Sequence, residues 1–305
     1  MDVDASESDL PVMRLLRLPL LLTILLFAVL LAGRGLGTVL PAPDVLSYSF
    51  YTRADQSRVY WMEARRGIVH RWRDDVLHGV SGAEWTRGGT RVAYMRQATG
   101  ARVDLEVYDL NTGEDFIVTN FINRPDQYAW SPDGECLLFI SFAVIRERCM
   151  RDDDSQLVWA DSFGGNIRAL DWSPDGTRVA YTYENDDGYH LALLDRETQQ
   201  AQRLTDEYFY KSTLSFSANG ENVTYLQTRE GITRLLVADV EGTGVSVLPL
   251  DDNIYSTSIS PYTDQLAYMR YDNGKWRLYL FDVAQNRHMA RAGFPRVGRT
   301  PSWVR

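Results

Sequence analysis

Residue types that support chemistry are sparse and scattered in this chain. The four histidines, at positions 70, 78, 190 and 288, stand in different parts of the sequence without the spacing of metal ligands. Carboxylates run together at 152–154, 186–187 and 251–252, but calcium needs oxygens from spaced positions, and adjacent aspartates point in different directions. The nearest approach to a nucleophile elbow, Gly-Val-Ser-Gly-Ala at 79–83, lacks the final glycine. These patterns predict no catalytic residue, no cofactor and no metal.

A repeated phrase organises the chain instead. The sequence WSPDG occurs at 130–134 and again at 172–176. Residues that match the leading tryptophan recur at spacings of 45, 42, 44, 43 and 44, the length expected of one four-stranded propeller blade. These lead positions are Trp85, Trp130, Trp172, Phe216, Ile259 and Trp303. A weaker first copy starts at Tyr51, but its step to Trp85 is only 34 residues.

Each part of the repeat has a local physical reason. In Ser-Pro-Asp-Gly, proline presets φ for the second turn position, aspartate suits the third and glycine supplies the exit. The segments that follow, such as TRVAYTY and NVTYLQT, are rich in β-branched and aromatic residues, as strands are. A second turn with glycine comes next, then a strand that ends on a recurring aspartate, which we interpret as structural because it repeats. These aspartates are Asp109, Asp161, Asp195, Asp239 and Asp282. The unit is therefore a four-stranded antiparallel meander, with the lead tryptophan packed between neighbouring blades.

The two WSPDG phrases resemble the WD40-like repeat called PD40, found in TolB-like propellers and in the propellers of prolyl oligopeptidase and dipeptidyl peptidase IV relatives. Degraded versions follow Trp85, Phe216 and Ile259, and the likeness covers about residues 46–305. The resemblance implies a propeller. It specifies function poorly, because propellers of this type serve unrelated tasks.

Two blade counts are open. Counting the second and third strands of the repeats gives six blades. Counting the first strands gives seven, because PSWVR at 301–305 begins a repeat that does not continue. We expect an all-β fold over 46–305: a six-bladed β-propeller of four-stranded antiparallel blades, closed by pairing of PSWVR with the strand around 58–63. The alternative, with seven first strands, treats 46–52 as a complete inner strand and leaves PSWVR as a surplus segment.

The N-terminus carries an uncharged apolar run, residues 18–33, preceded by Arg14 and Arg17 and followed by Arg34. With Leu15 and Leu16 it reaches about the length of a short transmembrane helix, and the arginines favour an exported C-terminal part. Arg34 stands where a lipoprotein box needs cysteine, which excludes lipidation there. We expect a cytoplasmic tail at 1–14, a transmembrane signal anchor at 15–33 and a linker at 34–45. A cleaved signal peptide is the alternative.

The two cysteines, Cys136 and Cys149, lie in the same repeat. If the hairpin keeps the register of the other blades, Cys136 lies at its base and Cys149 near its tip, roughly 40 Å away at ~3.3 Å per residue. We therefore expect no disulfide, with Cys136 buried and Cys149 exposed or half-buried, unless the insertion folds back.

The enlarged hairpin at 142–157 departs most from the repeat, and function in propellers tends to lie in the loops that differ. Its charged residues form a candidate partner-binding loop; a solvated tip without a specific role is the alternative. The candidates are Arg146, Arg148, Arg151, Asp152, Asp153 and Asp154.

Charge and motifs together predict a binding module. The net charge of −9 argues against nucleic acid and anionic lipid as partners. We expect a membrane-anchored extracytoplasmic propeller that contacts other envelope or membrane proteins. We expect it to be non-enzymatic, because the sequence contains no set of catalytic residues. The alternative is a secreted or tethered propeller that binds or processes a carbohydrate or small ligand at its central channel.

Overall fold

The computed structural model describes residues 45–53, 56–63, 68–71, 81–86, 89–97, 103–119, 127–152, 156–159, 163–250, 252–260, 262–263, 265–283, 285–293 and 298–303. The chain divides into two compact units, Met1–Leu40 and Pro41–Arg305, and every described residue belongs to the second. The predicted tail, anchor and most of the linker lie outside the described residues. Within the described ranges, no helix is long and apolar enough to span a membrane.

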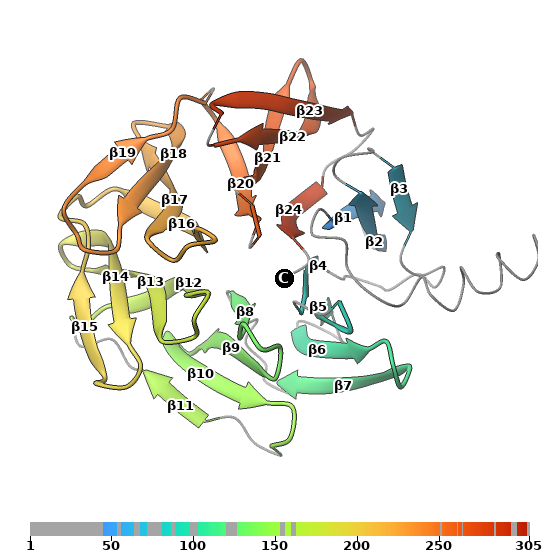
Figure 1. Cartoon of the computed structure of the whole chain (residues 1–305), viewed down its shortest axis with the longest axis horizontal. Coiled ribbons are helices and arrows are strands. Elements are labelled where there is room, and N and C mark those ends of the chain that lie inside the picture. The colour runs from blue at the N-terminus through green and yellow to red at the C-terminus, as the bar shows by residue number, and fades with distance from the viewer. Residues whose placement is uncertain are drawn as a thin grey trace, which may run out of the picture. The chain divides into compact units, whose positions relative to one another are not determined.

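The described chain consists of strands arranged in four-stranded antiparallel sheets (Figure 1). Five of these sheets are blades of four consecutive strands, each named below by its inner strand. The β4 blade contains β4 (Ser81–Trp85), β5 (Arg91–Gln97), β6 (Val103–Asp109) and β7 (Glu114–Thr119). The β8 blade contains β8 (Tyr128–Trp130), β9 (Cys136–Ser141), β10 (Val144–Cys149) and β11 (Gln156–Trp159). The β12 blade contains β12 (Asn166–Trp172), β13 (Arg178–Asn185), β14 (Gly188–Asp195) and β15 (Gln200–Arg203).

The remaining two blades follow the same order. The β16 blade contains β16 (Tyr210–Phe216), β17 (Asn222–Arg229), β18 (Ile232–Asp239) and β19 (Val245–Val247). The β20 blade contains β20 (Ile254–Ile259), β21 (Gln265–Asp272), β22 (Lys275–Asp282) and β23 (Arg287–Gly293). A closing sheet is made from both ends of the unit: β24 (Gly298–Trp303), β1 (Val45–Arg53), β2 (Gln56–Glu63) and β3 (Ile68–Arg71).

The closing sheet corrects the predicted fold. β24 pairs with β1, Leu46 opposite Trp303 and Phe50 opposite Gly298, and not with the strand around 58–63. Instead of six or seven equivalent blades after a transmembrane helix, the described chain has five blades of consecutive strands and one composite sheet. The reason is that Tyr51 belongs to a second strand and is no lead residue, which also explains the short step of 34 residues to Trp85. Alternation identifies a strand but does not identify its partner.

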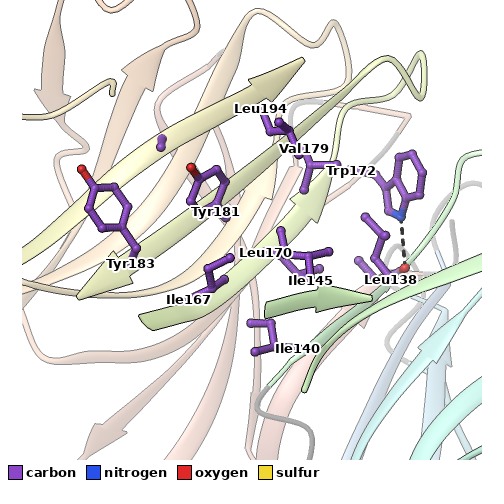
Figure 2. Packing of buried hydrophobic residues seen from close by; sticks show 12 residues of the cluster. Leu138, Ile140, Ile145, Ile167, Leu170, Trp172, Val179, Tyr181, Tyr183 and Leu194 are labelled. Atoms are coloured by element: carbon purple, nitrogen blue, oxygen red, sulfur yellow. Dashed lines mark hydrogen bonds between the residues drawn. The ribbon is translucent and has the colours of Figure 1, made fainter. Parts of the chain in front are cut away.

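The inner strands contact one another in the order β4, β8, β12, β16, β20 and β24, and β24 contacts β4. They surround a common centre (Figure 1), and the core is distributed between blades. Side chains alternate across each sheet: Tyr181 packs toward the β8 blade, with Ile140 and Leu138 (Figure 2), whereas Ala180 packs toward the β16 blade. Burial of apolar surface between blades therefore holds the ring together.

The cysteine prediction is wrong. β9 and β10 are joined by a tight turn at Phe142 and Ala143, whose φ values of 54° and 62° are those of a type I′ hairpin. This turn puts Cys149 directly opposite Cys136, with the Cα atoms 3.9 Å apart, and the two form a disulfide. The extra residues lie between β10 and β11, whereas the prediction had placed them at the tip of the preceding hairpin.

Candidate protein-binding face

The Ser-Pro-Asp-Gly corners are rigid turns that join the inner strand of a blade to its second strand. In the β12 blade the Ser173 hydroxyl donates to Asp175 at 2.6 Å and accepts from the backbone N–H of Arg178 at 2.9 Å. The hydrogen bonds that Asp175 accepts from the Ser173 hydroxyl and from the Thr177 N–H hold the pKa of its carboxyl group below the usual value. Because side chains satisfy the turn internally, the corner has a fixed shape.

Successive corners are stacked around the ring. The Arg178 guanidinium donates to the Gly220 carbonyl of the next corner at 3.1 Å, and Arg91 donates in the same way to Gly134, also at 3.1 Å. A Cβ on Gly220 would lie 3.4 Å from Pro174 of the preceding corner. The corners of the β4, β8, β12 and β16 blades therefore form one continuous surface, and this side of the propeller is called the corner face below.

The lead residues link each inner strand to the preceding blade. The indole N–H of Trp172 donates to the Ala129 carbonyl at 3.2 Å, drawn as the dashed line in Figure 2, and Trp130 donates to the Glu84 carbonyl at 3.0 Å. The phenylalanine ring of Phe216 cannot donate a hydrogen bond as an indole does. Its backbone N–H instead donates to the buried carboxylate of Asp171 at 2.9 Å. Trp85 and Ile259 are also buried, and the side chain of Trp303 lies outside the described set.

A hollow opens on the corner face between neighbouring blades. Its volume is ≈ 80 Å³. Its apolar lining comes from the lead residues Trp130, Trp172, Phe216 and Ile259 together with Pro132, Pro174 and Ala218, and its polar lining is Asp171, Ser173 and Ser217. Apolar walls with a few fixed polar groups are the usual composition of a binding pocket. This hollow has room for one apolar side chain of a partner.

The predicted partner-binding loop is not a single loop. Arg146 and Arg148 belong to β10, and the Arg148 guanidinium donates to the backbone carbonyls of Ile117 and Val118 in the neighbouring blade, at 3.0 and 2.8 Å. Arg151 is exposed and lies 3.8 Å from a Glu135 carboxylate oxygen, and Asp152 is exposed. Asp153 and Asp154 lie outside the described residues. Arg148 therefore connects the β8 blade to the β4 blade.

A second inter-blade contact was missed by the sequence analysis. Arg196 binds both carboxylate oxygens of Glu147 at 2.9 Å and lies over the Trp172 ring, 4.4 Å from its centroid. Burial raises the pKa of Glu147, and Arg196 opposes that rise. Cys136 occupies the position that Arg91 and Arg178 hold in their own blades, so this blade uses another link. The cysteine at a position where two other blades have arginine was the feature of the sequence that could have indicated a different contact here.

The other sequence candidates serve the blades. The repeated aspartates, which were interpreted as structural, cap the turn after the third strand: Asp109, Asp195 and Asp239 each accept a backbone N–H at 2.8 Å. Asp161 lies outside the described residues. Cys136, Glu147 and Cys149 lie close enough together to hold a metal, but both sulfurs are in the disulfide and are not thiolates.

A ring of four-stranded antiparallel blades, with Ser-Pro-Asp-Gly or related corners between the first and second strands, defines a PD40-type β-propeller. The chain belongs to the PD40 family, described as TolB beta propeller domain, whose model matches residues 89–303.

Curated relatives match only parts of the chain. It is 34% identical to the Tol-Pal system protein TolB of Hydrogenovibrio crunogenus over 91 residues, 30% of this chain and 21% of that protein. It is 28% identical to the uncharacterized peptidase YuxL of Bacillus subtilis over 168 residues, 50% of this chain and 24% of that protein. The chain thus spans about a quarter of the length of these relatives.

Solved structures show the same fold. TolB from Acinetobacter baumannii matches with a TM-score of 0.71 at 20% identity, covering 87% of this chain and 68% of that one. A chain of the Nidogen/Laminin complex matches with a TM-score of 0.67 at 11% identity, covering 85% and 97%. At these identities the likeness concerns the fold alone.

Proposed function

We propose that this propeller is a non-enzymatic protein-interaction module, and that its corner face receives an apolar peptide segment of another envelope or membrane protein. The observation that carries the proposal is the hollow on the corner face, lined by lead residues and by the corner residues Pro132, Pro174 and Ala218. The family supports it at the level of the fold, since two relatives are named as Tol-Pal system proteins.

The physical argument rests on pre-organisation. The corners are fixed by internal hydrogen bonds and by arginine contacts between blades, so a partner meets a surface that loses little conformational freedom on binding. Pro174 and Ala218 are half-buried, and a ligand side chain would complete their burial. Asp171 and Ser217 are held by bonds within the propeller, to the Phe216 N–H and to Asn222, so the polar part of the lining is also fixed before a partner binds.

Ala218→Arg tests the site, because an arginine at this turn position fills the hollow without disturbing the buried core. Gln285→Arg is the matched control: Gln285 is exposed in a 3–4 turn on the same face, and its backbone N–H bonds Asp282. Full-length protein carrying each change is purified from native membranes in mild detergent, and co-purifying proteins are quantified by mass spectrometry.

The proposal predicts a stoichiometric partner with wild type and Gln285→Arg that is lost with Ala218→Arg. A benzoylphenylalanine crosslinker at position 218 should join covalently to the same partner. Identical sets of co-purifying proteins from all three forms would contradict a binding role for the hollow. A sugar that raises the melting temperature of wild type and of Ala218→Arg equally would favour the alternative of a carbohydrate-binding central channel.

We also propose that residues 15–33 anchor the propeller to a membrane, with the propeller on the extracytoplasmic side. The support is the apolar run between the arginine-bearing tail and the linker. Intact-mass measurement of the membrane-purified protein tests the anchor: the mass of the uncleaved chain is expected, and a mature protein that begins after Gly33 would contradict it.

A further inference from the structure

The loop between β15 and β16, residues 205–209, is called the tyrosine loop here. Inner strands run toward the corner face, and each fourth strand runs away from it, because neighbouring strands in a blade are antiparallel. The tyrosine loop, which follows a fourth strand, therefore lies at the edge opposite the corner face. We propose that this loop and the adjoining β13–β14 turn form a second docking surface, for an arginine- or lysine-bearing segment of a partner protein.

The tyrosine loop has a rigid backbone. The ammonium group of Lys211, fully buried, donates to the carbonyls of Tyr189, Glu207 and Phe209 at 2.9, 2.7 and 3.2 Å. The Tyr208 carbonyl accepts the N–H of Tyr189 at 3.2 Å. Burying a lysine is costly unless its charge is fully hydrogen-bonded, and here that charge is used to fix a surface loop. A loop fixed in advance loses little entropy when a partner binds.

Aromatic rings project from this fixed backbone and from Tyr210, the first residue of β16. Tyr208 is 64% exposed and Tyr210 is 48% exposed. Tyr208 packs on Phe209, with ring centroids 4.7 Å apart, and Tyr210 meets Tyr189 edge to face at 5.0 Å. Exposed tyrosines held on a rigid loop are the residues that dominate protein interfaces, because they bury a large area at low conformational cost.

The same surface already holds one guanidinium group. Arg229 of the neighbouring blade lies over the Phe209 ring, 4.7 Å from the centroid. This intramolecular contact shows that a cation stacks against the rings of this loop. The exposed faces of Tyr208 and Tyr210 offer the same contact to a cation from outside.

The charge of the surroundings selects a cationic partner. Asp186 and Asp187 are exposed in the β13–β14 turn, and within the described part of the chain neither carboxylate forms a salt bridge. Gly188 ends that turn directly against Tyr208, where an added Cβ would come within 2.6 Å of the Tyr208 backbone. Asp206 is fully exposed and lies 3.6 Å from Arg203. Carboxylates beside exposed rings favour arginine or lysine over neutral or acidic segments.

The surface is tested with a fluorescently labelled peptide, (Gly-Arg)5, titrated with the full chain in detergent and followed by fluorescence anisotropy. The matched peptides (Gly-Gln)5 and (Gly-Asp)5 separate charge from aromatic contact. Tyr208→Ala removes the ring, and Asp186→Asn with Asp187→Asn removes the charge. Tyr255→Ala removes a tyrosine of similar exposure, 54%, from another blade, and Glu114→Gln with Glu241→Gln removes two exposed carboxylates at the corner face.

We expect wild type to bind (Gly-Arg)5 saturably. The dissociation constant should rise at least fivefold for Tyr208→Ala and for the Asp186/Asp187 double variant, and it should stay within twofold of the wild-type value for both controls. Equal weakening by the control variants would overturn the proposal, because attraction would then come from net charge alone. Equal binding of (Gly-Gln)5 would overturn the cationic selectivity. The inference does not rest on the proposed corner-face function, since Ala218→Arg is expected to leave (Gly-Arg)5 binding intact.

Discussion

Removal of the Cys136–Cys149 disulfide is expected to destabilise the propeller by about 3 kcal/mol. The two cysteines are 13 residues apart in sequence, and closing a loop of about 15 residues removes enough entropy from the unfolded chain to account for ~3 kcal/mol. In a domain of this size each kcal/mol shifts the melting temperature by about 2–4 °C. A decrease of roughly 6–12 °C follows for the Cys136→Ala/Cys149→Ala double variant.

Guanidinium denaturation followed by tryptophan fluorescence measures the free energy of unfolding of both proteins. The unfolded variant lacks a cross-link and exposes more surface, so its m-value should rise as its midpoint falls. Reductant should bring wild type to the stability of the double variant and should leave the double variant unchanged. β10 also carries Glu147, the partner of Arg196, so hydrogen exchange should accelerate first where the β8 and β12 blades meet.

Two results would refute this reasoning. Alkylation of both thiols in native, unreduced protein would show that the disulfide is absent. A loss below about 1 kcal/mol with the disulfide present in wild type would show that the unfolded chain is already constrained around this hairpin.

Three further predictions concern single residues. Burial lowers the pKa of Lys211 to about 8 from its ordinary 10.5, so the unfolded chain binds the proton more tightly than the folded chain. Relative to Lys211→Met, the free energy of unfolding of wild type should therefore rise as pH increases from about 8 to about 10.5. A difference between the two proteins that does not change with pH would contradict this. Gly188→Ala should cost about 2 kcal/mol, because φ is +119° and the new Cβ meets the backbone of Tyr208; a melting temperature equal to that of wild type would show that the loop yields freely. Trp172→Phe leaves the Ala129 carbonyl without its donor and should cost roughly 1–3 kcal/mol, measured by urea denaturation, whereas a neutral change would mean that water replaces the indole.

The sequence by itself determined the repeat and the chemistry of its corners. Turn residues at fixed offsets act locally, so Ser173, Asp175 and Gly176 could be assigned a role without knowledge of the rest of the chain. Alternation also identified most strands, and the recurring aspartates were recognised as structural because the position repeats from blade to blade.

Only the tertiary structure decided which strands pair and which residues meet. The end strand β24 pairs with β1, and the β9–β10 turn at Phe142 brings Cys149 opposite Cys136, because register depends on turn geometry that composition does not encode. The hollow joins lead residues of neighbouring blades, and Lys211 reaches carbonyls contributed by β14 and by the tyrosine loop. Such sites depend on contacts between segments about 40 residues apart or on loops folded back over a neighbouring blade. The repeat in the sequence shows how far apart these segments lie along the chain, but it does not show which of their residues touch.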